Sequence, residues 1–404
     1  CFRHILKQYP NHVGALTHLG ITLCHKGAFT EGADYYERAL ALQPDYRNAL
    51  NNLGNALHAL GKTTEAIDVY KRVISAQPDD PEGHKNMAMS LLMLGRFDEG
   101  WREYECRWQT TQLTTAQRNF SQPQWHGEDA RGLTLLIHAE QGFGDTLQFC
   151  RYAPLAAARG IKIVLEVQPE LVRLMNSLVG IEKVIGRGEP LPDFDLHCPM
   201  MSLPLAFGTQ VETIPAEAAY LSAPPESSAK WQKRLGDSKC FRVGLIWAGN
   251  PRLFSSDLAA ANRRRSMPPE RLAPLIEVEN IEFYSLQKDS PQPSAELGLI
   301  DLMAECSDFA DTAALIANLD LVISVDTAAA HLAAAIGKPV WLLNRYDSCW
   351  RWFRSRDDSP WYPTTRLFRQ SRPGDWGSVI EAVRGELERI DRGEIKTMKT
   401  QFEA

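Results

Sequence analysis

Residues 44–78 read PDYRNALNNLGNALHALGKTTEAIDVYKRVISAQP, and this stretch decides the fold of the N-terminal region. It begins and ends with Pro, and a Gly lies midway between them. A period of 34 residues with a helix breaker at each end predicts two antiparallel helices per unit, stacked into a solenoid. The landmarks that repeat at this spacing are Pro10, Pro44 and Pro78; Gly27, Gly61 and Gly95; and Tyr36, Tyr70 and Tyr104.

The glycines of each unit have two predicted roles. Gly27, Gly61 and Gly95 lie where the first helix of a unit must end, and Gly adopts a left-handed cap at little steric cost. Gly20 and Gly54 lie where the two helices of a unit are expected to approach closely. The second helices are predicted over Phe29–Leu42, Thr63–Ala76 and Phe97–Trp108.

This pattern resembles the tetratricopeptide repeat over residues 1–109, with about three repeats of which the first is truncated. The resemblance implies an α-solenoid whose concave face binds a protein or peptide. Residues 2–10 are interpreted as the second helix of an earlier repeat, and the chain does not begin with Met, so we expect further repeats before it. The alternative is that the repeats only cap the rest of the fold.

Composition excludes several classes of protein. The chain has 404 residues, 44% of them hydrophobic, which predicts a soluble globular protein of two to four domains. A net charge of −6 argues against a general nucleic-acid binder. No apolar stretch reaches the length of a membrane span, about 18 residues. Eight scattered cysteines without a C-x-x-C pair predict neither a zinc site nor a disulfide framework, and favour a reducing, cytoplasmic compartment. We expect no cofactor.

The period ends after Trp108, and strands then alternate with helices. This alternation predicts two Rossmann-like domains, each with a parallel sheet, facing a cleft. We place a linker at 110–131, the first domain at 132–222, the second at 239–372 and a packing helix at 373–392. Strands are predicted at 133–139, 162–167, 183–185, 242–247, 281–286, 319–324 and 339–343, and helices at 146–158, 170–178, 268–276, 311–317 and 327–336.

The first candidate site follows the first strand of the first domain, in the sequence HAEQGFGDT from His138 to Thr146. Ligands of open α/β sheets bind at the carboxyl ends of the strands. Gly142 and Gly144 would let a ligand approach the backbone, and Asp145 would accept a proton from an acceptor hydroxyl. The alternative is that Asp145 only caps the next helix, because Asp is among the best N-cap residues.

The second candidate site is the sequence SVDTAAAHL from Ser324 to Leu332. Small residues at a helix start leave N–H groups open to a phosphate, and Asp326 and Thr327 can hydrogen-bond a sugar or phosphate. Thr327 and His331 lie one turn apart on the same helix face, next to Ala328. The alternative is that Thr327 caps the helix and His331 packs against a neighbouring strand.

The third candidate site combines Asn250, at a strand end, with three consecutive arginines at 263–265. Guanidinium groups suit phosphate oxygens, so Arg264 and Arg265 are predicted to bind a diphosphate. Gln287 and Lys288 follow another strand and would join this site, and 253–261 is interpreted as a mobile loop over it. The alternative is that the arginines form a solvated charge run.

Gly144-Asp145, together with Asp326-Thr327-x-x-x-His331-Leu332, resembles the glycosyltransferase family of the bacterial heptosyltransferases over about residues 130–390. The resemblance implies the GT-B fold, a nucleotide-sugar donor held mainly by the second domain, Asp145 as catalytic base, and donor contacts from Asp326, Thr327 and His331. The family has Gly after Asp-Thr, whereas this chain has Ala328. The overall layout is similar to that of the protein O-linked N-acetylglucosamine transferases.

These observations predict an inverting, metal-independent glycosyltransferase whose donor is a nucleotide-diphosphate sugar and whose repeats recruit an acceptor or partner protein. A non-catalytic scaffold and a nucleotide-sugar epimerase are the alternatives. One aromatic cluster is either a sugar platform or core packing. Its members are Trp350, Trp352, Phe353, Trp361 and Tyr362.

Overall fold

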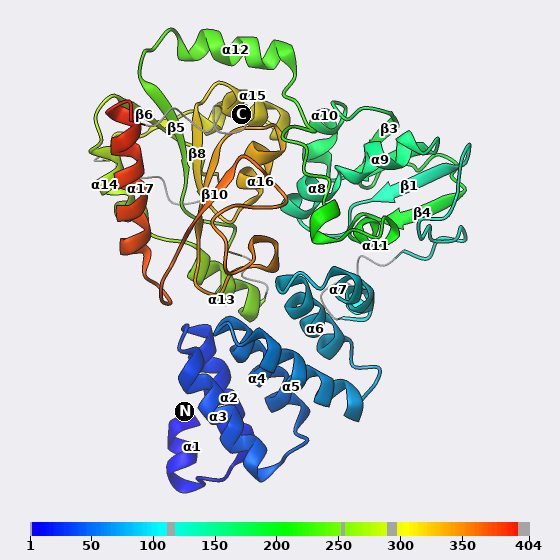
Figure 1. Ribbon diagram of the computed structural model, residues 1–404, viewed down its shortest axis with the longest axis vertical. Helices are drawn as coiled ribbons and strands as arrows, with labels where there is room; N and C mark the ends of the chain where they lie inside the picture. The colour runs from blue at the N-terminus through cyan, green and yellow to red at the C-terminus, as the bar shows by residue number, and fades with distance from the viewer. Residues whose placement is uncertain (1, 111–117, 252–254, 289–296, 395–404) are drawn as a thin grey trace.

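The computed structural model describes residues 2–110, 118–251, 255–288 and 297–394. Its N-terminal region is a row of antiparallel helices (Figure 1). The predicted helices Phe29–Leu42 and Thr63–Ala76 agree with the structure, whereas the third ends early because the chain tightens into a 3-10 turn at Glu105–Gln109. The helices are α1 (Phe2–Gln8), α2 (Val13–His25), α3 (Phe29–Leu42), α4 (Arg47–Ala59), α5 (Thr63–Ala76), α6 (Pro81–Met93) and α7 (Phe97–Tyr104).

Both predicted roles of the repeat glycines are confirmed. Gly27, Gly61 and Gly95 have φ angles of 83°, 83° and 76°, the left-handed region that favours Gly. Gly54 lies against the ring of Tyr70, and a Cβ there would lie only 2.6 Å from its Cζ. The helices of a repeat therefore touch through a glycine and a tyrosine ring placed 16 residues later.

Replacing Gly54 by Ala is expected to lower the free energy of unfolding by about 1–3 kcal/mol, because the methyl group overpacks the buried Tyr70 ring. Gly385 is the matched control, since it also lies in a helix, and a Cβ added there would meet no other atom within 4 Å. Replacing Gly385 by Ala should raise the free energy of unfolding by up to about 1 kcal/mol, because Ala favours the helix over Gly. Urea denaturation measures both, and equal changes at the two positions would contradict the packing argument.

The first α/β domain contains a parallel sheet in the order β3-β2-β1-β4. Its strands are β1 (Thr134–His138), β2 (Lys162–Val167), β3 (Ile181–Gly186) and β4 (Leu196–Pro199), and β4 was not predicted. The predicted helix 146–158 is two helices, since Pro154 has no N–H to donate to the turn before it. The helices are α8 (Phe143–Phe149), α9 (Tyr152–Ala158), α10 (Val172–Met175) and α11 (Leu203–Ala206).

The second α/β domain contains a larger parallel sheet in the order β10-β9-β8-β5-β6-β7. Its strands are β5 (Phe241–Ile246), β6 (Ile281–Ser285), β7 (Ile300–Asp301), β8 (Leu321–Val325), β9 (Val340–Asn344) and β10 (Thr365–Arg369). Its helices are α12 (Pro225–Leu235), α13 (Ser256–Arg265), α14 (Ala273–Ile276), α15 (Phe309–Ala317), α16 (Ala328–Ala335) and α17 (Trp376–Asp391). The fold class, helical repeats followed by parallel α/β sheets, is confirmed, and the predicted domain boundaries stay predictions.

Two polar segments are helices. The prediction of a mobile loop at 253–261 was wrong from Ser256 onward, because Ser255 caps α13 by accepting a hydrogen bond from the Leu258 N–H; residues 253 and 254 lie outside the described residues. The polar stretch 223–238 contains α12, which buries Trp231 and packs on α15. In both helices charged residues cover the exposed face. The composition of these segments alone therefore suggests a loop, although the segments are helical.

The turn inside each repeat faces the α/β region (Figure 1). Arg354 extends this contact, since its Nη2 donates to the carbonyl oxygens of His58 (2.9 Å) and Ala59 (2.6 Å) at the end of α4. A cation at that end also complements the helix dipole. The three turn glycines lie close to the α/β region. A Cβ added at Gly27 would lie 3.6 Å from Pro373, one added at Gly61 would lie 2.9 Å from Arg354, and one added at Gly95 would lie 3.1 Å from Val211.

An aromatic core joins α7 to the α/β region. Trp101 lies edge-on to Trp350 at 5.3 Å between ring centroids, and Phe97 stacks on Trp361 at 6.0 Å. All five members of the aromatic cluster are buried, so packing rather than a sugar platform accounts for it. Within the described ranges, no helix is both long and apolar enough to cross a membrane.

Candidate active site

The structure brings together the first two candidate sites, although they lie in different domains. Helix α8 follows β1, helix α16 follows β8, and the two helices pack against each other between the sheets (Figure 1). A Cβ at Gly144 would lie 3.0 Å from Cδ2 of His331 and 3.7 Å from Cα of Ala328. Gly144 is therefore needed for this close approach of the two motifs.

Asp145 makes two polar contacts from this junction. Its Oδ2 accepts a hydrogen bond from the Gly142 N–H (3.1 Å). The N-cap of α8 is Gly142 and Asp145 is the third residue of the helix, so the N-cap alternative was wrong in position, although the carboxylate supports the helix start. Its Oδ1 pairs with Nη2 of Arg351, which comes from the second domain. The Asp145 side chain keeps 23% of its surface exposed, so it is accessible from solvent. The role of general base stays a prediction.

Arg351, which the sequence analysis did not single out, lies in the 3-10 turn Trp350–Trp352 after β9. Its Nε donates to Oε1 of Gln148 (2.6 Å), and its guanidinium lies 4.4 Å from the centre of the Trp350 ring. Burial alone would lower its pKa, but the Asp145 carboxylate holds that pKa above its ordinary value. An arginine between two tryptophans was the available sequence signal.

Buried His331 and half-buried Asp326 form a pair. Nε2 of His331 lies 3.7 Å from Oδ1 of Asp326, and its Nδ1 is 2.8 Å from the hydroxyl of Tyr362. The His331 ring also stacks on Trp352, with 5.3 Å between centroids, so its packing role is real. Burial opposes ionisation of Asp326, but His331, Arg265 and Arg345 hold its pKa well below the ordinary value. Asp326 is therefore a carboxylate near neutral pH.

Thr327 is the N-cap of α16. Its Oγ1 accepts from the Ala330 N–H (3.4 Å) and lies 3.0 Å from Oγ of Ser324. The capping alternative is thus present here, whereas Asp145 supports its helix from the third position. Ala328 is the first residue of the helix, beside Gly144, so its Cβ lies at the junction of the two domains.

Arg265 joins the second site. Its Nη1 donates to the backbone oxygen of Asp326 (3.0 Å), and its Nε donates to Oδ1 of Asn262 (2.9 Å). A Cβ at Gly249 would overlap the Arg265 guanidinium, so that glycine makes room for it. Arg265 therefore connects the ends of β5 and β8.

The other residues of the third site lie at neighbouring strand ends. Oε1 of Gln287 accepts from the N–H groups of Trp247 (3.2 Å) and Ala248 (2.9 Å), which fixes the turn after β5. Asn250 and Lys288 are exposed beyond β5 and β6.

Arg264 is directed elsewhere than Arg265. It pairs with Asp347 at 2.9 Å and lies 5.3 Å from the centre of the Phe29 ring in the first repeat. Its predicted contact with the donor diphosphate stays a prediction.

The repeats hold the loop that carries Asp145. Nη2 of Arg107 lies 3.1 Å from Oε1 of Glu140, and Nε2 of Gln141 donates to the hydroxyl of Tyr104 (2.9 Å). Both members of the Arg107–Glu140 pair are buried, and burial raises the pKa of Glu140 to about 7 in spite of Arg107. The end of the repeat array is thus bonded to the candidate catalytic loop.

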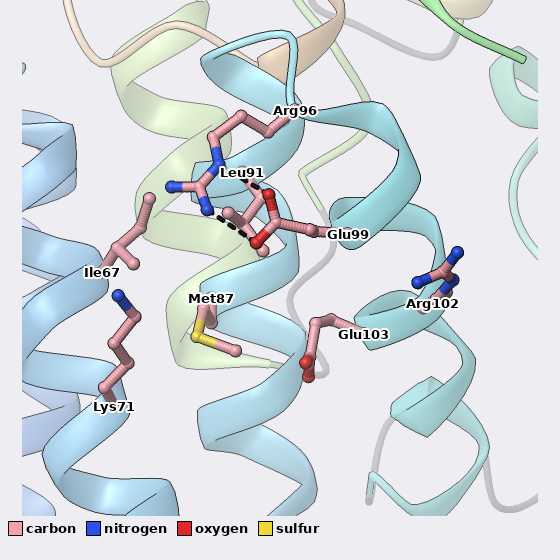
Figure 2. Close-up of a pocket in the computed structure, with 8 residues that line it drawn as sticks. All are labelled: Ile67, Lys71, Met87, Leu91, Arg96, Glu99, Arg102 and Glu103. Carbon is pink, nitrogen blue, oxygen red and sulfur yellow. Dashed lines mark hydrogen bonds and ion pairs between the residues drawn. The ribbon is translucent and has the colours of Figure 1, made fainter.

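A groove of about 270 Å³ lies among α5, α6 and α7 (Figure 2). Met87 and Leu91 form its floor, and Arg96 and Glu99 pair across one end at 2.6 Å. Its other lining residues are Ile67, Lys71, Arg102 and Glu103. The charges of this groove are largely compensated. Within the described part of the chain, no group of three His, Cys, Asp or Glu is arranged to hold a metal ion.

Comparisons with known proteins agree with this layout. A model described as tetratricopeptide repeat matches residues 1–46 and 26–81. A model described as glycosyltransferase family 9 (heptosyltransferase) matches residues 298–351, the segment that contains Asp326, His331 and Arg351. Protein FlbA of Caulobacter vibrioides is 28% identical over 324 residues, which cover 71% of this chain and 52% of that protein. The chain thus spans about half the length of this curated relative.

Two kinds of solved structure are similar. A crystal structure of MamA covers 29% of this chain and 69% of its own, with 21% identity and a TM-score of 0.26. A glycosyl transferase family 9 structure from Veillonella parvula covers 66% of this chain and 99% of its own, with 11% identity and a TM-score of 0.49. The family models thus identify tetratricopeptide repeats in the N-terminal region and, at residues 298–351, a glycosyltransferase family 9 (heptosyltransferase) segment within the second α/β domain.

Proposed function

We propose that this chain is an inverting GT-B glycosyltransferase that moves a sugar from a nucleotide-diphosphate donor to an acceptor hydroxyl. The observation that carries the proposal is the contact of Gly144 with His331, which places Asp145 beside the Asp326–His331 motif. The family 9 match to residues 298–351 supports a donor site at that motif.

The donor would bind at the ends of β5 and β8. Arg265 is a cation suited to the diphosphate, and the free N–H groups at the start of α16 add to it. Asp326 is anionic, so it suits sugar or ribose hydroxyls rather than phosphate. Gln287, Lys288 and Asn250 would complete the site. These groups would stabilise the departing nucleoside diphosphate without a metal ion.

The acceptor would approach from the side of Asp145. Its hydroxyl oxygen attacks the anomeric carbon and its proton goes to Asp145, while the bond from that carbon to the diphosphate oxygen breaks. Attack opposite to the leaving group inverts the configuration. Because Arg351 pairs with Asp145, the guanidinium must shift toward the substrate phosphates before Asp145 accepts the proton.

The repeats would recruit the acceptor or a partner protein, since arrays of this kind present extended binding surfaces. Their contacts through Arg107 and Tyr104 place that surface at a fixed position relative to the Asp145 loop.

The role of Arg265 can be tested with nucleoside diphosphates. A calorimetric screen of UDP, GDP, ADP, dTDP and CDP is expected to reveal one clear binder. Replacing Arg265 by Ala should weaken the binding of that nucleoside diphosphate about tenfold or more, because a charge-assisted hydrogen bond is lost. Arg271→Ala, on an exposed arginine of the same domain, should leave the affinity unchanged. Equal affinity of the two variants would remove Arg265 from the donor site.

A non-catalytic scaffold is the second candidate, and the pairing of Asp145 with Arg351 favours it, because the guanidinium occupies Oδ1 of the carboxylate that would accept the proton. Nucleotide binding without sugar transfer to any acceptor would support the scaffold. An epimerase is separated by the same assay, since it converts the donor sugar without an acceptor.

A further inference from the structure

A second cavity, of about 680 Å³, lies where the turn of the first repeat meets the second α/β domain. Lys26 contributes from the repeat, Arg263 and Arg264 from the end of α13, and Gln370 from the end of β10. The size is within the range of small-molecule sites, about 300–1,000 Å³. The sugar transfer proposed above uses none of these side chains, and Arg264, which the sequence predicts at the donor diphosphate, contacts Asp347 and Phe29 instead.

Gln370 supplies a donor that lacks an acceptor. Its Oε1 accepts from the N–H groups of Tyr346 and Gly374, both at 3.1 Å, so the amide cannot be flipped without placing donors against donors. Its Nε2 is buried and has no hydrogen-bond partner in the described structure, and the residue is only 6% exposed. A buried donor of this kind costs stability until an acceptor reaches it, and Gln370 is one of the residues that line the cavity.

The charges around Gln370 favour an anion. Lys26 and Arg263 are exposed at the rim, and in the described ranges neither has an ion-pair partner. Arg264 is compensated by Asp347, which is also 3.6 Å from Arg345. His25, at the rim, is compensated by Asp257 at 2.8 Å. The rim cations therefore leave a positive excess over the buried amide.

We propose that this cavity binds a small phosphorylated molecule, at a site separate from the nucleotide-sugar donor. Phosphate oxygens would accept from the Gln370 amide at the floor and from Lys26 and Arg263 at the rim. The organic part would lie toward Trp376, which lines the same cavity. Because Lys26 belongs to the first repeat and Gln370 to the second α/β domain, the ligand bridges the two.

Calorimetric titration of the intact chain with inorganic pyrophosphate tests this site. The double variant Lys26→Glu/Arg263→Glu should weaken binding about tenfold or more, since two charge-assisted contacts become repulsive. Lys230→Glu/Lys233→Glu, on the exposed face of α12, makes the same change in net charge and should leave the affinity unchanged. Gln370→Glu removes the buried donor while keeping the acceptor, and should also weaken binding.

The outcomes separate this proposal from the sugar-transfer proposal. If pyrophosphate binding persists in Arg265→Ala but is lost in Lys26→Glu/Arg263→Glu, the pyrophosphate binds in the cavity. The reverse pattern assigns it to the donor site and overturns the proposal, as does an equal loss in the α12 variant or no saturable binding. Saturable binding of a polyglutamate peptide but not of pyrophosphate would also overturn it, in favour of an acidic chain.

Discussion

Replacing Asp145 by Asn should slow sugar transfer by a factor of about 10²–10⁴ and leave the affinity for the nucleoside diphosphate unchanged. Asn keeps the shape of the side chain and an oxygen that accepts from the Gly142 N–H, so the start of α8 stays intact. It has no carboxylate to receive the acceptor proton. Initial rates of product formation and calorimetric affinities measure the two effects separately.

This substitution also discriminates between the two roles of Asp145. The Asn amide oxygen can accept from the Gly142 N–H as the Asp145 carboxylate does, so a residue that only supports the start of α8 would tolerate the change. A transfer rate within about tenfold of the parent chain would therefore remove the base assignment and leave the cap. The unliganded melting midpoint is the control, because Arg351 loses the charge of its partner in this variant.

Replacing Arg107 by Met should lower the free energy of unfolding by about 3–5 kcal/mol at pH 8, because Glu140 is left buried without its partner. Met keeps the apolar packing of the side chain. The variant also loses the hydrogen bond to Ser202 (2.8 Å), which joins the repeats to the first α/β domain, and the local contact with Glu105 (2.7 Å). Urea denaturation measures the loss.

The effect of Arg107→Met should grow with pH. In the parent chain the pKa of Glu140 is raised from 4.5 to about 7, so the folded state holds a proton that the unfolded chain has released, and stability falls as pH rises between these values. Without Arg107 the pKa rises further, so the decline continues above pH 7. The double variant Arg107→Met/Glu140→Gln should lose this dependence, and an unchanged pH profile in it would contradict the assignment.

The repeats were predictable because their signals are local. Gly61 and the 34-residue spacing fix a turn and two helices from neighbouring residues alone, and α3 and α5 agree with the predicted bounds. Helices α12 and α13 were missed because charged residues outnumber buried ones there. Edge strand β10 was missed for a similar reason, since TRLFR carries two arginines.

The candidate site was predictable only as separate motifs. Asp145 and His331 each follow a strand, so the sequence places them at sheet ends, but not beside each other. Their contact depends on how two domains pack, which no local spacing encodes. The partner of Asp145 is 206 residues away in the chain, and the different directions of Arg264 and Arg265 depend on Asp347 and Asp326.

Repeat arrays usually gain and lose units freely during evolution, because each unit contacts only its neighbours. The turns of this array are an exception, since Gly27, Gly61 and Gly95 meet three different parts of the α/β region. Deleting or inserting one 34-residue unit among them would shift every later turn onto the wrong neighbour. These repeats are therefore locked in copy number, and variation in the length of the array is expected only outside the docked units.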